Sequence, residues 1–397
     1  MLETGDIVSV CAMSAFTAEG LLVTSCIRLA TQPSVFGQTR LVALDPVTLD
    51  TLAVAPVAER PIVQNSAGGA YFSIDNNGRF VIGAPNNSIE IWELNRAGGV
   101  AVFMRRQGWD VSGVLAPGDL LQDTVADWEG NIWFASTQGI VGFVDPNDGS
   151  VETLDIAEGL QNSFAVDASG VYIVSYDAMY KFSVAGDGSV QQDWRTPYDN
   201  TGEGLTQPGS GTTPTLHGSL DDLVSFGDTA LPKINMVILD RTTGAEVCVT
   251  PIFRDNESGA ENTFATYGDE VIIPNNAGFT SSFGPQNTVE PGLERYSVRG
   301  DRTGCDPVWV NDTAIGNSAQ MSTTTGLIYG WGPDPGVTGF DAYYFTANDY
   351  TTGDEVYRVY AGDGRPFNPV LGQPHLGPDG AAYVGTLEGF IRIADGD

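Results

Sequence analysis

Two histidines are the only side chains of this 397-residue sequence whose ordinary pKa lies near neutrality. They occur in two similar segments, Thr215-Leu-His-Gly-Ser-Leu-Asp-Asp222 and Gln373-Pro-His-Leu-Gly-Pro-Asp-Gly380. Aligned on the turns that end these segments, His217 and His375 take the same register, which suits a pair of catalytic bases or metal ligands. The alternative is that carbonyl groups of the surrounding strands satisfy both rings.

Short runs of amides, hydroxyls and acids recur in the segments that correspond to these two along the chain. The runs are Gln64-Asn65-Ser66, Gln122-Asp123-Thr124, Gln161-Asn162-Ser163, Glu261-Asn262-Thr263 and Asn317-Ser318. Asp123 and Glu261 are the members that can ionise, so we expect them to act as catalytic acids or as ligands of a divalent Ca or Mg ion. Asn162 and Asn262 are predicted to bind a substrate carbonyl or a developing oxyanion. The alternative is a set of polar groups that only binds ordered water.

A second group of polar residues is expected on the loops that enter the same segments. Its members are Thr213, Thr215, Asp228, Lys233, Glu261, Asn262, Asn275 and Asn276. Lys233 is one of two lysines in the chain and is surrounded by acids and amides, which favours substrate binding. The alternative is a salt bridge at Lys233 and amides that cap loops.

The segments that carry these residues belong to a repeat with one hairpin turn per unit. The turns are Leu44-Asp-Pro-Val-Thr-Leu-Asp50, Leu94-Asn-Arg-Ala-Gly-Gly-Val100, Val144-Asp-Pro-Asn-Asp-Gly-Ser150, Val184-Ala-Gly-Asp-Gly-Ser189, Leu239-Asp-Arg-Thr-Thr-Gly-Ala245, Val298-Arg-Gly-Asp-Arg-Thr-Gly304 and Asn348-Asp-Tyr-Thr-Thr-Gly-Asp354. They start about 40 to 60 residues apart, the length of a four-stranded propeller blade. A second turn precedes each, as in Asp127-Trp-Glu-Gly130.

This repeat predicts an all-β fold: one propeller domain over residues 1–397, with eight blades of four strands. The first strands of the blades should line the central channel and carry the polar runs. The last unit lacks an outer strand, because the sequence stops shortly after Phe390-Ile-Arg-Ile-Ala394. We expect the alternating segment Asp6-Ile-Val-Ser-Val10 to join the last blade and close the ring.

Cysteine positions favour an oxidising compartment. Cys11 and Cys26 face each other in a hairpin centred on the turn at 17–20, which satisfies the geometry of a disulfide. Cys248 and Cys305 fall in the outer strands of blades five and six; a bridge suits this placement, and two buried thiols are the alternative. We expect an extracellular or periplasmic protein whose signal peptide is absent from this sequence.

The charge balance excludes several classes of partner. Eighteen basic and 50 acidic residues give a net charge of −32, which repels nucleic acids and anionic bilayers. No apolar run is long enough to span a membrane. These features favour a small-molecule or oligomeric organic substrate that is neutral or cationic.

Parts of the repeat resemble known propellers. Ala126-Asp-Trp-Glu-Gly-Asn-Ile-Trp-Phe-Ala135, followed by Val144-Asp-Pro, is similar to streptogramin-lyase-type repeats, and the turn at 239–244 resembles the quinoprotein-alcohol-dehydrogenase-like superfamily. Residues 160–394 are also similar to an exported quinoprotein-like family. The resemblance covers most of the chain and implies the fold without an activity, because propellers support many chemistries.

Motifs of several known chemistries are missing from the sequence. The adjacent cysteines that stack under the quinone of PQQ dehydrogenases do not occur, so PQQ is not expected, and two histidines are too few for a four-histidine iron site. Zinc pairs of the Cys-x-x-Cys type, a P-loop and a Gly-x-Ser-x-Gly elbow are missing too. We expect a lyase or hydrolase without a redox cofactor; the alternative is a non-catalytic ligand-binding or scaffold propeller.

Overall fold

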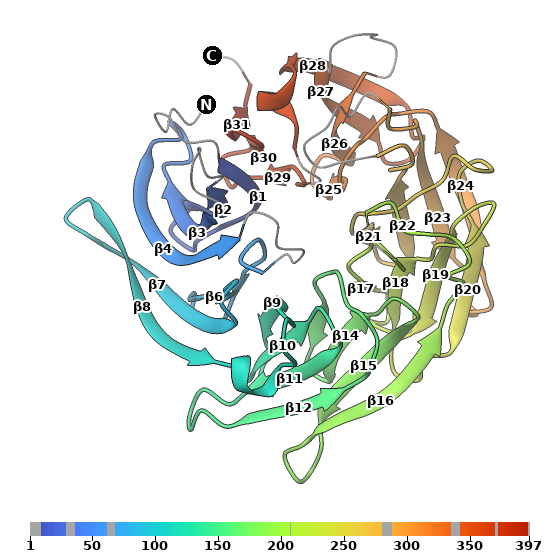
Figure 1. Ribbon diagram of the computed structural model, residues 1–397. Coiled ribbons are helices and arrows are strands. Elements are labelled where there is room, and N and C mark those ends of the chain that lie inside the picture. The colour runs from blue at the N-terminus through green and yellow to red at the C-terminus, as the bar shows by residue number, and fades with distance from the viewer. Residues whose placement is uncertain are drawn as a thin grey trace.

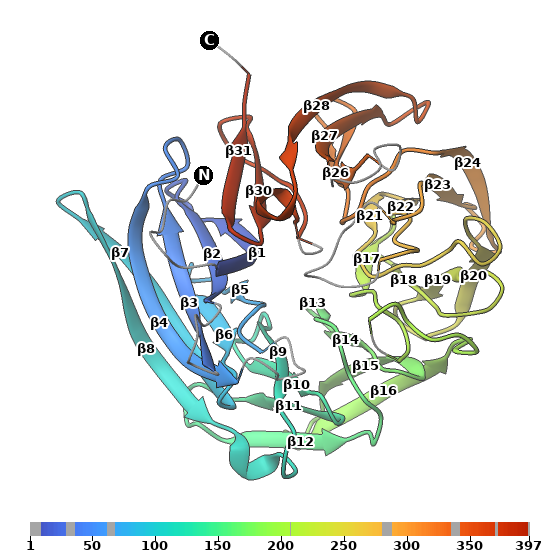
Figure 2. The ribbon, with the colours of Figure 1, turned by 45° about the horizontal axis from the view of Figure 1, so that its top comes forward.

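The computed structural model describes residues 9–28, 36–61, 68–206, 208–279, 288–334, 342–369 and 372–395. Within these residues, eight antiparallel sheets stand around a common axis as the blades of a propeller (Figures 1 and 2). Seven of the described sheets have four strands and the last has three. The predicted all-β, eight-bladed propeller is therefore confirmed.

Each blade follows the chain from an inner strand beside the axis to an outer strand at the rim. The inner strands are β1 (Ser9–Phe16), β5 (Ser73–Ile74), β9 (Leu121–Ala126), β13 (Ala165–Asp167), β17 (Thr215–His217), β21 (Ala265–Tyr267), β25 (Gln320–Ser322) and β29 (His375–Leu376). The second strands are β2 (Leu22–Arg28), β6 (Phe80–Gly83), β10 (Ile132–Ser136), β14 (Gly170–Val174), β18 (Leu223–Gly227), β22 (Glu270–Pro274), β26 (Leu327–Pro333) and β30 (Ala382–Thr386). The third strands are β3 (Phe36–Leu44), β7 (Ser88–Ala97), β11 (Ile140–Val144), β15 (Ala178–Val184), β19 (Asn235–Asp240), β23 (Leu293–Val298), β27 (Ala342–Asp349) and β31 (Gly389–Ile393). The outer strands are β4 (Thr51–Pro61), β8 (Val100–Asp110), β12 (Val151–Asp155), β16 (Val190–Pro197), β20 (Glu246–Pro251), β24 (Cys305–Asn311) and β28 (Glu355–Asp363). Two short 3₁₀ helices are η1 (Ser112–Val114) and η2 (Arg365–Phe367).

The turns that predicted the repeat are stabilised by their own side chains. Oδ1 of Asp240 accepts hydrogen bonds from the backbone N–H groups of Thr242 and Thr243, at 3.0 and 2.8 Å. Gly244 follows with a φ of 72°, a conformation that favours glycine. The Asp-x-x-x-Gly pattern therefore marks the connection between the third and outer strands, because these two residue types fix the turn.

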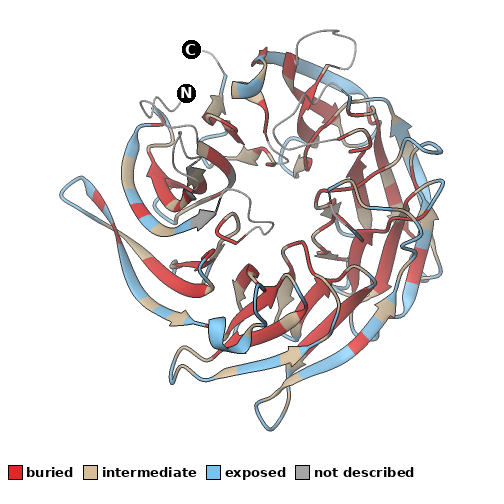
Figure 3. Cartoon of the chain, viewed as in Figure 1, coloured by how far each residue is buried: buried red, intermediate tan, exposed pale blue. Residues whose placement is uncertain are grey.

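The core lies between the blades. Second strands such as β10 and β18 are buried along their whole length, whereas residues 355–360 of β28 are exposed (Figure 3). Eight clusters of buried apolar side chains occupy the eight junctions between neighbouring blades. Each blade therefore buries both faces against its neighbours.

The ring closes differently from the prediction. Ser9 and Val10 pair with Arg28 and Ile27 of β2, within the first blade, so these two residues do not extend the last sheet. Asp6–Val8 lie outside the described residues. Antiparallel pairing across the short turn at 17–20 closes only a small loop, which favours the first blade as the partner.

Apolar packing joins the first and last blades. Tyr383 and Phe390 of the last blade share a buried cluster with Leu22 and Leu44 of the first. The ring of inter-blade contacts is thus continuous across this junction.

Both predicted disulfides are present. Cys11 and Cys26 have Cα atoms 4.2 Å apart, and a β-bulge between Val10 and Met13 brings them opposite each other. Cys248 of β20 is bonded to Cys305 of β24, with Cα atoms 5.8 Å apart, and joins blades five and six. Two disulfides indicate a location outside the cytosol.

Removal of either disulfide should destabilise the fold in proportion to the loop that it closes. The sequence separations are 57 residues for Cys248–Cys305 and 15 for Cys11–Cys26. Loop-closure entropy then gives losses of about 4 and about 3 kcal/mol in the free energy of unfolding for the two double Cys→Ser variants. Urea titration measures both losses, and a larger loss for the Cys11/Cys26 variant contradicts the entropic ranking.

Candidate active site at the inner strands

The predicted acid Asp123 lies in β9, one of the strands beside the axis. Its side chain is buried, and its Oδ2 accepts a hydrogen bond from the hydroxyl group of Ser163, a residue that precedes β13. Its Oδ1 accepts the backbone N–H of Thr124 at 2.6 Å. Burial raises the pKa of Asp123 to about 7, although these two bonds act in the opposite direction. Asp123 therefore exchanges its proton near neutral pH.

Glu261, the second predicted acid, is bound by a segment that we call the strap, residues 199–206 between β16 and β17. Its carboxylate accepts the N–H groups of Leu205 and Thr206 at 2.8 and 3.2 Å, and the Thr206 hydroxyl group at 2.7 Å. Burial raises the pKa of Glu261, and the three bonds oppose this effect. The carboxylate of Glu261 therefore has a clear structural task, which is to anchor the strap.

The strap connects the loops that enter the inner strands of blades four and six. Oγ1 of Thr206 also accepts Nε2 of Gln161 at 2.7 Å, so one threonine connects the polar runs of two blades. Gly211 lies against the same carboxylate, where an added Cβ would come within 2.5 Å of the Glu261 carboxyl carbon. A residue with a side chain at this position would displace Glu261.

Tyr71 belongs to the same site and was not predicted from the sequence. It precedes β5 and is partly buried. Burial raises the pKa of its phenol, and the charges of Asp123 and Glu261 raise it further. The phenol therefore lies within electrostatic range of both acids. The sequence could have indicated Tyr71, because Tyr71 lies just before an inner strand, as Glu261 does.

The asparagines predicted to bind an oxyanion hold loops together. Nδ2 of Asn162 donates to the carbonyl groups of Ser210 and Thr212 at 2.8 and 3.3 Å. Nδ2 of Asn262 donates to Oδ1 of Asn276 at 3.1 Å. Their role toward a substrate stays a prediction.

The two histidines lie on inner strands of blades five and eight, as expected, but in different registers. His217 pairs with Leu223, whereas His375 pairs with Tyr383, eight residues further on. The residue of blade five that also pairs eight residues on is Leu216, which pairs with Val224. Both histidines nevertheless lie on the face of their blade that packs against the next blade, because their partners Leu223 and Tyr383 belong to the apolar clusters at those junctions.

Neither histidine is poised for acid–base chemistry at neutral pH. Burial lowers the pKa of each ring to about 4. Nδ1 of His217 contacts the carbonyl oxygen of Gly268 at 3.2 Å, at the hairpin-turn end of the blades, whereas Glu261 lies at the end where the chain enters them. The expectation that a histidine titrates near neutrality is therefore not met.

Asp228 and Lys233, which were predicted to bind substrate together, contact different partners in the structure. Asp228 is buried and accepts the N–H and Nδ2 of Asn235 at 2.5 and 2.6 Å; burial raises its pKa. Lys233 forms an exposed salt bridge with Asp255 at 3.2 Å.

The predicted threonines line the approach to blade five. Oγ1 of Thr215 donates to the carbonyl oxygen of Phe264 at 3.2 Å, and Thr213 is half-buried. These contacts place them near β17, with no direct bond to Asp123 in the part of the chain that the structure describes.

Metal binding finds no ready site among the described residues. No group of three or more His, Cys, Asp or Glu side chains converges there to hold an ion. Within the same residues, no helix is long and apolar enough to cross a membrane.

The protonation of Asp123 should appear in the pH dependence of stability. Its pKa is about 7 in the folded protein and near 4 in the unfolded chain, so the folded state binds more protons between these values. The free energy of unfolding therefore falls as pH rises from about 4 to about 7, by at most about 4 kcal/mol from this group. Asp123→Asn should remove this decrease, so that the variant gains stability relative to wild type at pH 8 and not at pH 4, as urea titrations would show.

An exposed turn acid provides the control. The Ser189 side chain lowers the pKa of Asp187 by hydrogen bonding, so Asp187→Asn should change the pH profile in the opposite sense. Parallel profiles for wild type and Asp123→Asn would show that Asp123 ionises normally in the folded protein.

Comparisons with known proteins agree with the fold. No family model matches the chain. An uncharacterized protein of Archaeoglobus fulgidus is 27% identical over 324 residues, which are 71% of this chain and 62% of that protein, so the chain spans less than two thirds of that relative.

The structural similarities extend over the whole chain. Sqt1 of Saccharomyces cerevisiae matches with a TM-score of 0.62 at 9% identity, over 98% of this chain and 97% of that one. Sqt1 of Chaetomium thermophilum bound to the N-terminus of ribosomal protein L10 matches with 0.61 at 10%, over 99% and 98%. The C-terminal WD40 domain of Sif2 matches with 0.54 at 11%, over 98% and 97%. At these identities the similarity shows a shared propeller fold and nothing further.

Proposed function

We propose that this chain is a hydrolase for small neutral or cationic organic substrates, with Asp123 as its general base. The observation that carries the proposal is the hydrogen bond from the Ser163 hydroxyl group to the buried Asp123 carboxylate. A serine bonded to a base within hydrogen-bond reach is the arrangement that nucleophilic catalysis requires. Ser163 is the more exposed member of the pair, so a substrate would meet the hydroxyl group first.

The reaction follows from the pKa of Asp123. As the Ser163 oxygen attacks a substrate carbonyl carbon, Oδ2 of Asp123 takes the hydroxyl proton and later gives it to the leaving group. Water, deprotonated by Asp123, then attacks the acyl group on Ser163, and the proton returns to the Ser163 oxygen as the acid product leaves. A base with a pKa of about 7 suits both halves, because it is ionised in part and protonated in part at neutral pH.

Tyr71 is proposed as the hydrogen-bond donor to the developing oxyanion. Burial and the two nearby acids raise the pKa of its phenol, so it stays protonated and can donate. Glu261 is assigned a positioning role through the strap, since three donors already occupy its carboxylate.

The substrate class follows from charge. With a net charge of −32 the protein repels anions at long range, which leaves neutral and cationic molecules. The same base would serve a lyase if the proton that it removes were bound to carbon. We also propose export to the cell surface or periplasm, which two disulfides and an acidic surface support.

A non-catalytic binding propeller is the second candidate. In its favour, the amides of Asn162 and Asn262 are engaged with neighbouring protein groups, and one similar structure is of a propeller bound to a peptide N-terminus. In that case Ser163 would only satisfy the buried Asp123.

Activity measurements on chromogenic neutral esters, lactones and amides test the proposal. Wild type should hydrolyse at least one of these substrates, with a rate that rises through the pKa of Asp123 near pH 7. Ser163→Ala and Asp123→Asn should each lower kcat/KM by roughly two to four orders of magnitude, the usual contribution of a positioned base. Mass spectrometry of Ser163 after reaction with a slow acyl donor should find the acyl group there.

Variants of the two histidines are the matched controls. His217→Ala and His375→Ala should retain activity, since burial keeps both rings neutral and other groups perform the chemistry. Loss of activity in either variant with Asp123→Asn unaffected would restore the histidine hypothesis. Absence of turnover across the substrates, with folded protein, would favour the binding propeller.

A further inference from the structure

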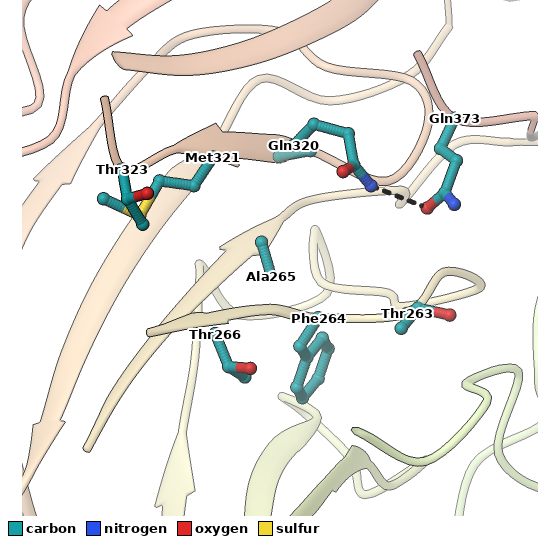
Figure 4. Close-up of a pocket in the computed structure, with 9 residues that line it drawn as sticks. Thr263, Phe264, Ala265, Thr266, Gln320, Met321, Thr323 and Gln373 are labelled. Carbon is teal, nitrogen blue, oxygen red and sulfur yellow. Dashed lines mark hydrogen bonds between the residues drawn. The ribbon is translucent and has the colours of Figure 1, made fainter. Parts of the chain in front are cut away.

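A pocket of about 220 Å³ lies along the inner strands of blades six, seven and eight. Figure 4 shows its lining, which comes from β21 and β25 with the residues beside them and from Gln373, which precedes β29. The lining residues are Thr263, Phe264, Ala265, Thr266, Ala319, Gln320, Met321, Thr323 and Gln373. No residue of the proposed active site is among them.

The pocket is uncharged in a strongly charged protein. The chain has 68 Asp, Glu, Lys and Arg residues, from 18 basic and 50 acidic, yet none lines this pocket. An ion that entered would lose water and gain no counter-charge. A neutral molecule avoids this cost.

Two glutamine amides provide the polar recognition. Nε2 of Gln320 donates to Oε1 of Gln373 at 3.0 Å, which fixes both side chains across the junction of blades seven and eight. Both residues are only half-buried, so the pocket side of the pair offers Oε1 of Gln320 as an acceptor and Nε2 of Gln373 as a donor. In Figure 4 the two amides lie across the pocket from Phe264 and Thr263.

We propose that this pocket binds a small, neutral, planar molecule with a carboxamide or lactam group. Such a group presents one donor and one acceptor, so it can donate to Oε1 of Gln320 or accept from Nε2 of Gln373. The apolar part of the lining, Phe264, Ala265 and Met321, accommodates a ring. This inference is independent of the proposed hydrolase.

Three probes of the same shape and different charge test it: benzamide, benzoate and benzamidinium. Ligand-observed NMR titration of the full chain should show benzamide binding about 10-fold more tightly than either ion. Gln320→Ala and Gln373→Ala should each weaken benzamide binding by about 5- to 10-fold, the value of one hydrogen bond. Gln191→Ala, an exposed glutamine on β16, is the matched control and should change nothing.

A charge-reversing variant keeps the test decisive if the alanine variants fail to fold. Gln373→Glu preserves the shape and the acceptor for Gln320 and adds a negative charge, so the preference should change from benzamide to benzamidinium. Asp123→Asn should leave benzamide binding unaltered, which separates this pocket from the proposed active site.

Three results would overturn the proposal. They are no detectable binding of benzamide, equal binding of all three probes, and benzamide binding that survives both Gln320→Ala and Gln373→Ala in folded protein.

Discussion

Apolar packing between neighbouring blades is the interaction on which the rest of this structure depends. Each of the eight junctions contains a buried cluster, and the junction between the last and first blades is no exception, with Tyr383 and Phe390 packed against Leu22. Because stability resides in these clusters, the short inner strands need not supply apolar side chains. They are free to carry amides, hydroxyls and acids, and this freedom creates the candidate sites.

The same packing determines the electrostatics of the inner strands. Arginines bind their acids away from Asp123, as Arg302 does with Asp222 and Asp269 at 2.8 and 2.9 Å. Asp123 therefore experiences burial without a cation among the groups that act on its pKa, and its pKa rises. Ionisation of an acid in this setting costs free energy, and acids with such raised pKa values are frequent at functional sites.

Residue patterns in the sequence predicted the features of the fold that are determined by neighbouring residues along the chain. Asp and Gly residues such as Asp240 and Gly244 mark turns that any blade needs, so the repeat, the eight blades and both disulfides followed from the sequence. The arrangement of the candidate site could not be predicted, because it depends on two properties that residue spacing does not determine. One is register, because His217 pairs six residues further on and His375 eight residues further on; the other is burial, which raises the pKa of the acids and lowers the pKa of the histidines.

Asp123 and Glu261 show how hydrogen-bond donors divide the roles of two buried acids. Burial raises the pKa of both, but Glu261 accepts three bonds from the strap, whereas Oδ2 of Asp123 accepts one bond from the Ser163 hydroxyl group, the proposed nucleophile. The charge of Glu261 still reaches the site, because together with Asp123 it disfavours ionisation of Tyr71. A phenol within electrostatic range of two acids stays protonated, so it can serve as the proposed donor to negative charge on a substrate. In the proposed reaction, Asp123 would take the proton, and the charges of both acids would keep the Tyr71 phenol protonated as a donor.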